Sequence, residues 1–160
     1  MIIELLEDGF FAAIAAVGFS SVSNPPRRAY AYCAAIAAVG HSVRYLLTSL
    51  PFLHLHIIPA STLAAFTIGI LAVFCSPRAK CPAETCLFPA LLPMIPGMYA
   101  YRTIVALLLC LWHSQEKAFT HYFYLLTYNG LTCAFIVLGL VVGATLPLSL
   151  FKRISYQATR

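Results

Sequence analysis

The feature that most constrains this chain is a series of long apolar runs separated by short polar stretches. The clearest run, residues 57–75, contains no charged side chain. A transmembrane helix needs roughly 20 mainly apolar residues. The whole chain follows the same trend, since 61% of its 160 residues are hydrophobic and only 9% are charged, whereas an ordinary soluble domain is about 45–50% apolar and about 25% charged. The sequence predicts an integral membrane protein with room for about five spans and none for a separate soluble catalytic domain.

The apolar runs and the breaks between them predict an all-α bundle that forms a single transmembrane domain over residues 1–160. The expected membrane-spanning helices cover residues 2–22, 29–50, 57–75, 85–112 and 119–151. The first helix ends at SNPPRR, because proline cannot continue a helix and the residue before it avoids helical geometry. The last range is longer than a hydrocarbon core of about 30 Å requires, so we expect that helix to tilt or to continue along the interface.

Charged residues near the helix ends predict how the chain is oriented. The first run begins with acidic residues, whereas a cleavable signal peptide begins with basic ones, so we expect this run to stay in the mature protein. Cytoplasmic loops carry an excess of Lys and Arg. With the N-terminus outside and the C-terminus in the cytoplasm, the outer side receives only Arg44 and Lys117, and the cytoplasmic side receives Arg27, Arg28, Arg78, Lys80, Lys152, Arg153 and Arg160.

The motifs of soluble enzymes are missing from the sequence. It has no G-x-S-x-G, no P-loop, no H-E-x-x-H and no G-x-G-x-x-G. Two histidines in a loop, His54 and His56, lack an evident third ligand. Three cysteines around another loop, Cys75, Cys81 and Cys86, match no metal or redox spacing, so we interpret them as reduced thiols. We expect no catalytic residue, no metal and no cofactor, and the absence of a basic run argues against a nucleic-acid partner.

The segment LLPMIPGMYAYR interrupts the fourth apolar run. Its prolines lack an N–H and clash with the preceding turn, and its glycine adds backbone freedom, so the segment predicts a helix whose second half starts near Met98. The first N–H groups of such a half-helix carry partial positive charge, and transporters use them to hold anionic groups. We therefore expect the backbone of Pro96, Gly97 and Met98, together with Arg102, to bind a substrate carboxylate. The alternatives are a proline kink made for packing and an arginine that extends to the interface.

Polar residues in two other spans are further candidates, because such residues at membrane depth often mark a substrate or ion path. His41 and Arg44 are three residues apart and share one helix face. Histidine can change its charge near neutral pH, which suggests a role in proton coupling or in the transport path. The alternative for this pair is a structural hydrogen bond beside an interfacial arginine. Asn129 could contact substrate, or it could form a hydrogen bond between helices.

These motifs together resemble the threonine/serine exporter family, specifically its C-terminal module of five spans. The resemblance rests on an Ala- and Gly-rich first helix, the SNPPRR turn, the G-H-x-x-R pattern that contains His41 and Arg44, the P-x-x-P-G-x-x-x-Y-R element that ends in Tyr101 and Arg102, and LTYNGLT around Asn129. SNPPRR departs from the usual turn by an extra proline. The resemblance covers nearly the whole chain and adds Tyr101 to the expected substrate-binding residues.

The resemblance implies an exporter of the inner membrane for threonine and serine, or for succinate-like carboxylates, driven by the proton motive force. It also implies a longer membrane subunit of the same family as partner, because 160 residues match the short subunit of the split form. An alternative of another class is a non-transporting assembly or regulatory subunit, which would tolerate neutral residues at Arg44 and Arg102. A membrane-embedded enzyme acting on lipid would need a nucleophile or acid pair that the sequence lacks.

Overall fold

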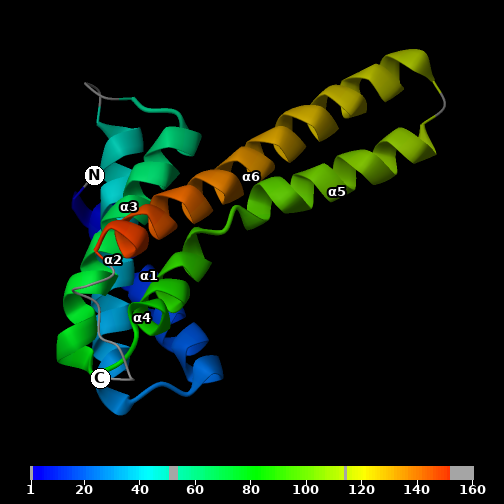
Figure 1. Ribbon diagram of the computed structural model, residues 1–160. Coiled ribbons are helices and arrows are strands. Elements are labelled where there is room, and N and C mark those ends of the chain that lie inside the picture. Colours follow the sequence, from blue (N-terminus) through cyan, green and yellow to red (C-terminus); the bar gives the residue numbers. More distant parts are fainter. Residues whose placement is uncertain (1, 51–53, 114, 152–160) are drawn as a thin grey trace. The chain divides into compact units, whose positions relative to one another are not determined.

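The computed structural model describes residues 2–50, 54–113 and 115–151, and over these residues the secondary structure consists of helices joined by short connections, with no strand (Figure 1). The elements are α1 (Ile2–Ser23), α2 (Arg27–Ser49), α3 (Ile57–Ala79), α4 (Ala83–Leu91), the 3₁₀-helix η1 (Leu92–Met94), α5 (Gly97–Trp112) and α6 (Glu116–Leu150). The predicted all-α class is confirmed. Residues 51–53 of one expected loop, and the basic tail residues Lys152, Arg153 and Arg160 used for the orientation, lie outside the described residues.

Two of the described helices, α3 and α6, are long and apolar enough to cross a membrane. A third membrane span results if α4 with η1 is counted together with α5 as one broken span. The remaining long helices, α1 and α2, carry charged side chains, which are Glu4, Glu7 and Asp8 in α1 and Arg27, Arg28 and Arg44 in α2. Five crossings therefore remain a prediction.

The fourth apolar run is broken where the sequence predicts it. The first half ends with η1 at Met94, and the second half starts at Gly97. Pro96 precedes the second half with a backbone ψ of 61°, which is far from helical values. The N–H of Gly97 bonds to the carbonyl of Ile95 at 2.8 Å, so the chain turns tightly at this point.

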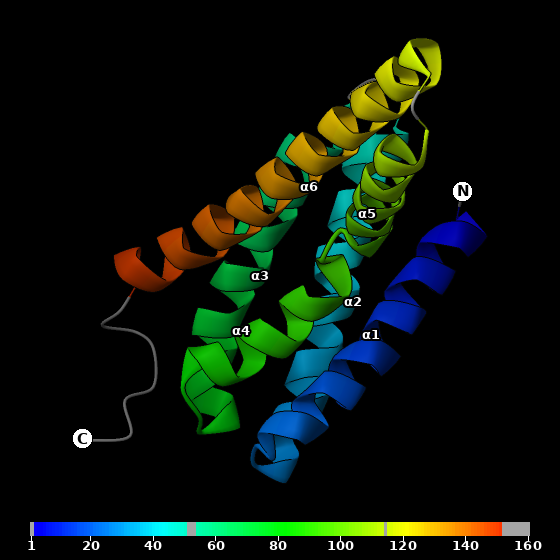
Figure 2. The ribbon, with the colours of Figure 1, turned by 90° about the vertical axis from the view of Figure 1, so that its right-hand side faces the viewer.

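Over the described residues, the chain packs as two compact units. The first unit comprises Met1–Met94 with Gly139–Arg160, and the second comprises Ile95–Leu138. In the first unit, α2 lies between α1 and α3, and α4 packs against all three (Figure 2). Three small residues at four-residue spacing on α1, Ala12, Ala16 and Ser20, are buried. Small side chains let helix backbones approach closely.

The last turns of α6 belong to the first unit and pack against α3. Gly139 and Gly143, which are four residues apart on α6, meet α3 at Thr62. A Cβ added to Gly143 would overlap the carbonyl oxygen of Thr62 and lie 3.2 Å from the backbone N of Phe66. Because these neighbours are backbone atoms, they cannot turn aside as a flexible side chain would. Glycine at this position is what allows the two helix backbones to come so close.

This packing predicts that Gly143→Ala destabilises the protein by about 1–3 kcal/mol, since overpacking forces backbone shifts. The matched control is Gly18→Ala on α1, where an added Cβ meets nothing within 4 Å. We expect the control to be neutral or slightly stabilising, because alanine is the better helix former. Thermal unfolding of both variants in the same detergent measures the difference. Equal unfolding temperatures for the two variants would contradict the close packing of α6 on α3.

Candidate functional site

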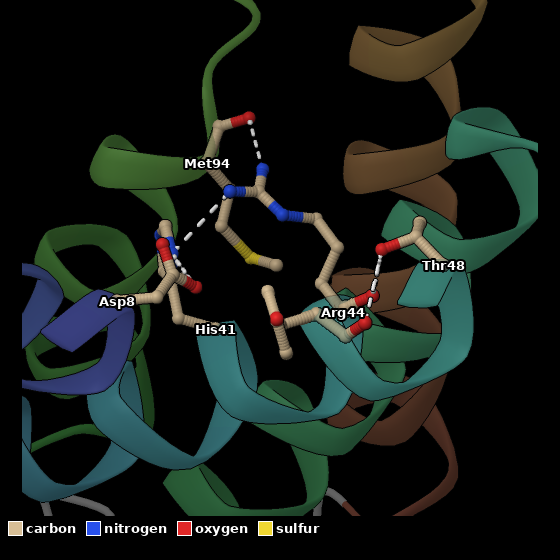
Figure 3. Close-up of polar contacts among 6 residues, drawn as sticks. Asp8, His41, Arg44, Thr48 and Met94 are labelled. Atoms are coloured by element: carbon tan, nitrogen blue, oxygen red, sulfur yellow. Dashed lines mark hydrogen bonds and ion pairs between the residues drawn. The ribbon is translucent and has the colours of Figure 1, made fainter. Parts of the chain in front are cut away.

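A cluster of ionisable side chains joins α1, α2 and the end of η1 in the first unit (Figure 3). The Nδ1 atom of His41 lies 3.1 Å from a carboxylate oxygen of Asp8. The same Nδ1 lies 3.3 Å from Nη2 of Arg44. The other ring nitrogen, Nε2, is buried and has no hydrogen-bond partner among the described residues. The cluster thus places an acid, an imidazole and a guanidinium in direct contact.

The local sequence explains how these groups meet. His41 and Arg44 lie one turn apart on the same face of α2, as their spacing predicts. Asp8 reaches them from α1 because the next residue, Gly9, allows the two helices to approach: a Cβ there would lie 3.1 Å from Oγ of Ser42. The His41 side chain is only 7% exposed and that of Asp8 is 35% exposed. The imidazole is therefore enclosed, and its carboxylate partner has access to the outside of this chain.

Arg44 connects the cluster to the break in the fourth run. Its Nη1 donates to the carbonyl oxygen of Met94 at 3.4 Å, and Met94 is the last residue of η1. The final carbonyls of a helix have no partner within the helix, and they carry partial negative charge. A cation at this position donates a hydrogen bond to the carbonyl and interacts favourably with the dipole of the first half-helix. Arg44 therefore caps the proline-glycine break on its carbonyl side. In sequence, Arg44 is further from the break than Arg102 is.

A second polar contact between α1 and α2 lies one helical turn from the cluster. The hydroxyl of Tyr45 donates to a carboxylate oxygen of Glu4 at 2.7 Å. The sequence analysis missed Glu4 and Asp8 as site residues, although a signal existed. The two acids are four residues apart on α1, and His41 and Tyr45 are four residues apart on α2, so antiparallel helices can pair them.

The second unit holds another group of the expected residues. A hollow of about 400 Å³ lies between α5 and α6, and its lining includes Tyr101, Arg102 and Asn129 with the rings of Tyr122 and Tyr128. Arg102 is exposed and, among the described residues, has no hydrogen-bond or ion-pair partner. The structure therefore brings three of the residues expected to bind substrate to one cavity.

The remaining residues expected to bind substrate lie at the break and do not line this hollow. Pro96 is buried, whereas Gly97 and Met98 are exposed. The side-chain amide of Asn129 donates to the carbonyl of Leu125 in its own helix at 2.7 Å. This bond within α6 differs from the hydrogen bond between helices that the sequence offered as an alternative. An asparagine in a helix can satisfy its amide locally, and sequence alone does not reveal this choice.

The described cysteines are all free. Two of them, Cys81 and Cys86, have sulfur atoms 3.8 Å apart, and burial raises the pKa of the Cys81 thiol in the loop before α4. A raised pKa keeps a thiol protonated and unreactive. No group of three His, Cys, Asp or Glu side chains in the described part of the chain is arranged to hold a metal ion.

An enclosed ionisable cluster beside a broken apolar helix, in an all-α membrane protein, is an arrangement typical of secondary transporters. A comparison with protein families makes this class specific. Residues 8–150 match the family described as "Threonine/Serine exporter, ThrE". The chain belongs to the threonine/serine exporter family, which is a family of transporters.

One curated relative is an uncharacterized protein of Haemophilus influenzae (strain Rd), which is 35% identical over 151 residues. That alignment covers 94% of this chain and 49% of the relative. The chain thus spans about half the length of the curated relative that it matches. No solved structure matches this chain.

The contrast between the two arginines predicts different effects on stability. Arg44→Gln should destabilise the protein by about 1–3 kcal/mol, because it takes the guanidinium away from the Met94 carbonyl and from Nδ1 of His41. Arg102→Gln is the matched control and should change stability by less than about 0.5 kcal/mol, since Arg102 is exposed. Thermal unfolding of both purified variants checks this. A larger loss for Arg102→Gln would show that the contacts of Arg44 are not the stabilising ones.

Proposed function

We propose that this chain is a membrane subunit of a secondary exporter for small carboxylate-bearing metabolites such as threonine, serine or succinate. It works in the inner membrane, with its N-terminus outside and its C-terminus in the cytoplasm. The proton motive force drives export. The observation that carries the proposal is the cluster of Asp8, His41 and Arg44, in which Arg44 bonds to the broken helix at Met94, in a member of an exporter family. Ionisable groups at membrane depth are costly and usually serve transport.

On the substrate side, the proposal assigns the carboxylate to Arg102. This residue lies in the first two turns of α5, near the positive end of that half-helix. A guanidinium and the N–H groups at the start of a helix both favour anions. The hollow beside Arg102 adds the Tyr101 ring and Asn129, which can contact the rest of a small metabolite. At the break, Pro96 has no N–H and the N–H of Gly97 is bonded to the carbonyl of Ile95, so the proposal assigns the first backbone N–H for the carboxylate to Met98.

The proposal also includes a longer membrane subunit of the same family as partner. Two observations support it: the matched relative is about twice as long as this chain, and Arg102 is exposed on a helix with an apolar surface. A cation at the centre of a membrane helix costs about 2.5–3.5 kcal/mol on insertion scales. A partner subunit that encloses Arg102 in a shared, water-filled interior removes most of this cost.

The direct test of the substrate site is Arg102→Ala. We expect this variant to insert and assemble normally and to lose export of threonine, serine or succinate, because the carboxylate has no cation to bind. Arg102→Lys should retain part of the activity, since it keeps the charge but not the planar fork. Export is measured in cells that express the chain alone and with its longer partner. Normal export by Arg102→Ala would remove Arg102 from the site and favour an assembly or regulatory subunit.

The test of proton coupling is His41→Gln. Glutamine keeps a hydrogen-bonding side chain at this position but cannot take up a proton between pH 5 and 8. We expect its export rate to depend far less on pH than that of the parent chain over this range. Initial export rates from vesicles at a series of pH values provide the measurement. An unchanged pH profile would dismiss His41 as the coupling residue while leaving the substrate site untested by this variant.

A further inference from the structure

One ring nitrogen of His41 lies within reach of two partners, and it cannot form a hydrogen bond with both at the same time. Nδ1 lies 3.1 Å from the Asp8 carboxylate and 3.3 Å from Nη2 of Arg44. A protonated Nδ1 can only donate, so it bonds to the carboxylate. A deprotonated Nδ1 can only accept, so it bonds to the guanidinium. The position of a single proton therefore decides which of the two neighbours drawn in Figure 3, Asp8 or Arg44, the imidazole holds.

We propose that Asp8, His41 and Arg44 form a proton-operated latch on the break in the fourth helix, in which Asp8 delivers the proton. In the closed state, His41 is neutral, its Nδ1 accepts from Arg44, and Arg44 holds the carbonyl of Met94. In the open state, His41 is protonated on both nitrogens and donates Nδ1–H to Asp8. The imidazolium then offers Arg44 no acceptor and repels its positive charge.

The proton reaches His41 through Asp8 because the two side chains differ in access. Asp8 is 35% exposed and the imidazole is 7% exposed. A proton taken up by the Asp8 carboxyl moves to Nδ1, which leaves a carboxylate that accepts a hydrogen bond from the new imidazolium. Atoms and charge balance in this single transfer, and no other reactant is needed.

The surroundings of His41 leave few other groups that could act in this way. From α1, the facing charged group is Asp8, and from α2 it is Arg44. From η1, the nearby polar groups are the backbone carbonyls of Pro93 and Met94. Glu4 lies one turn from Asp8 on α1, where it accepts from Tyr45. Within the described residues, Asp8 and Arg44 are the charged groups that act on the ring.

The latch acts at the position where the first unit of the chain ends. Met94 is fully buried, and its carbonyl is the last one before the tight turn at residues 95–97. Loss of the Arg44 bond leaves this carbonyl with no cation to offset its partial charge. The end of η1 should then separate more readily from α2, which loosens the start of α5. This inference rests on the proposed function for its purpose, but its structural test does not require transport.

Amide hydrogen exchange across residues 91–100 tests the latch in the full-length parent chain in lipid nanodiscs. Labelling times at pH 6 and pH 8 are scaled for the intrinsic effect of pH on exchange. We expect the corrected exchange to be at least threefold faster at pH 6 than at pH 8. His41→Gln should abolish this difference, and Asp8→Asn should shift it to lower pH, because the imidazolium loses its carboxylate partner. Equal corrected exchange at both pH values in the parent chain would overturn the latch.

The control variant is Glu4→Gln, which removes one acidic charge from the same helix without touching His41. It should behave as the parent chain does, and a shift equal to that of Asp8→Asn would show a general charge effect and refute the role of Asp8. If Asp8→Asn fails to fold, Asp8→Glu keeps the carboxylate and should retain the pH dependence; its loss would also count against the latch. Hydrogen exchange at the break that depends on pH, in a chain that does not export, would support the latch and refute the proposed function. Export that depends on pH, with hydrogen exchange at the break that does not, would support the proposed function and refute the latch.

Discussion

The structure depends on the need to satisfy the backbone of a helix that is interrupted inside an apolar protein. Pro96 cannot continue the helix, and the carbonyl of Met94 is left without a partner in its own segment. An unpaired buried carbonyl costs about 1–3 kcal/mol. Arg44 supplies the missing donor from α2. The break can exist because a cation about fifty residues earlier in the chain caps it.

This solution creates a second requirement, because a guanidinium among apolar helices needs an anion nearby. Asp8 provides the negative charge and reaches the cluster through His41. That contact in turn requires α1 and α2 to lie close together. Gly9 beside the cluster, and the buried small residues Ala12 and Ala16 further along α1, make this approach possible. The position of α1 therefore follows from the electrostatic demand of the break as much as from apolar packing.

The sequence predicts the local features well, because periodicity and proline act over a few residues. It places the break within one residue of its observed position, and it puts His41 and Arg44 on one face of α2. It did not identify Asp8, since the pairing of α1 with α2 joins residues 33 positions apart. It also grouped Arg102 with the backbone at the break, whereas Arg102 lines the hollow with Asn129. Which helix faces turn toward each other is decided by packing between distant segments, which one sequence does not reveal.

The two arginines near the break differ in a way that bears on their roles. Arg44 lies at the carbonyl end of the first half-helix, where a cation is favoured and where it has partners. Arg102 lies in the second turn of the second half-helix, away from the carbonyl end where the dipole favours a cation, and no described side chain forms an ion pair with it. A structural role explains the first residue but not the second. A cation without a partner in an apolar helix is costly, and its presence is understandable if an anion binds there; a carboxylate-bearing substrate is such an anion.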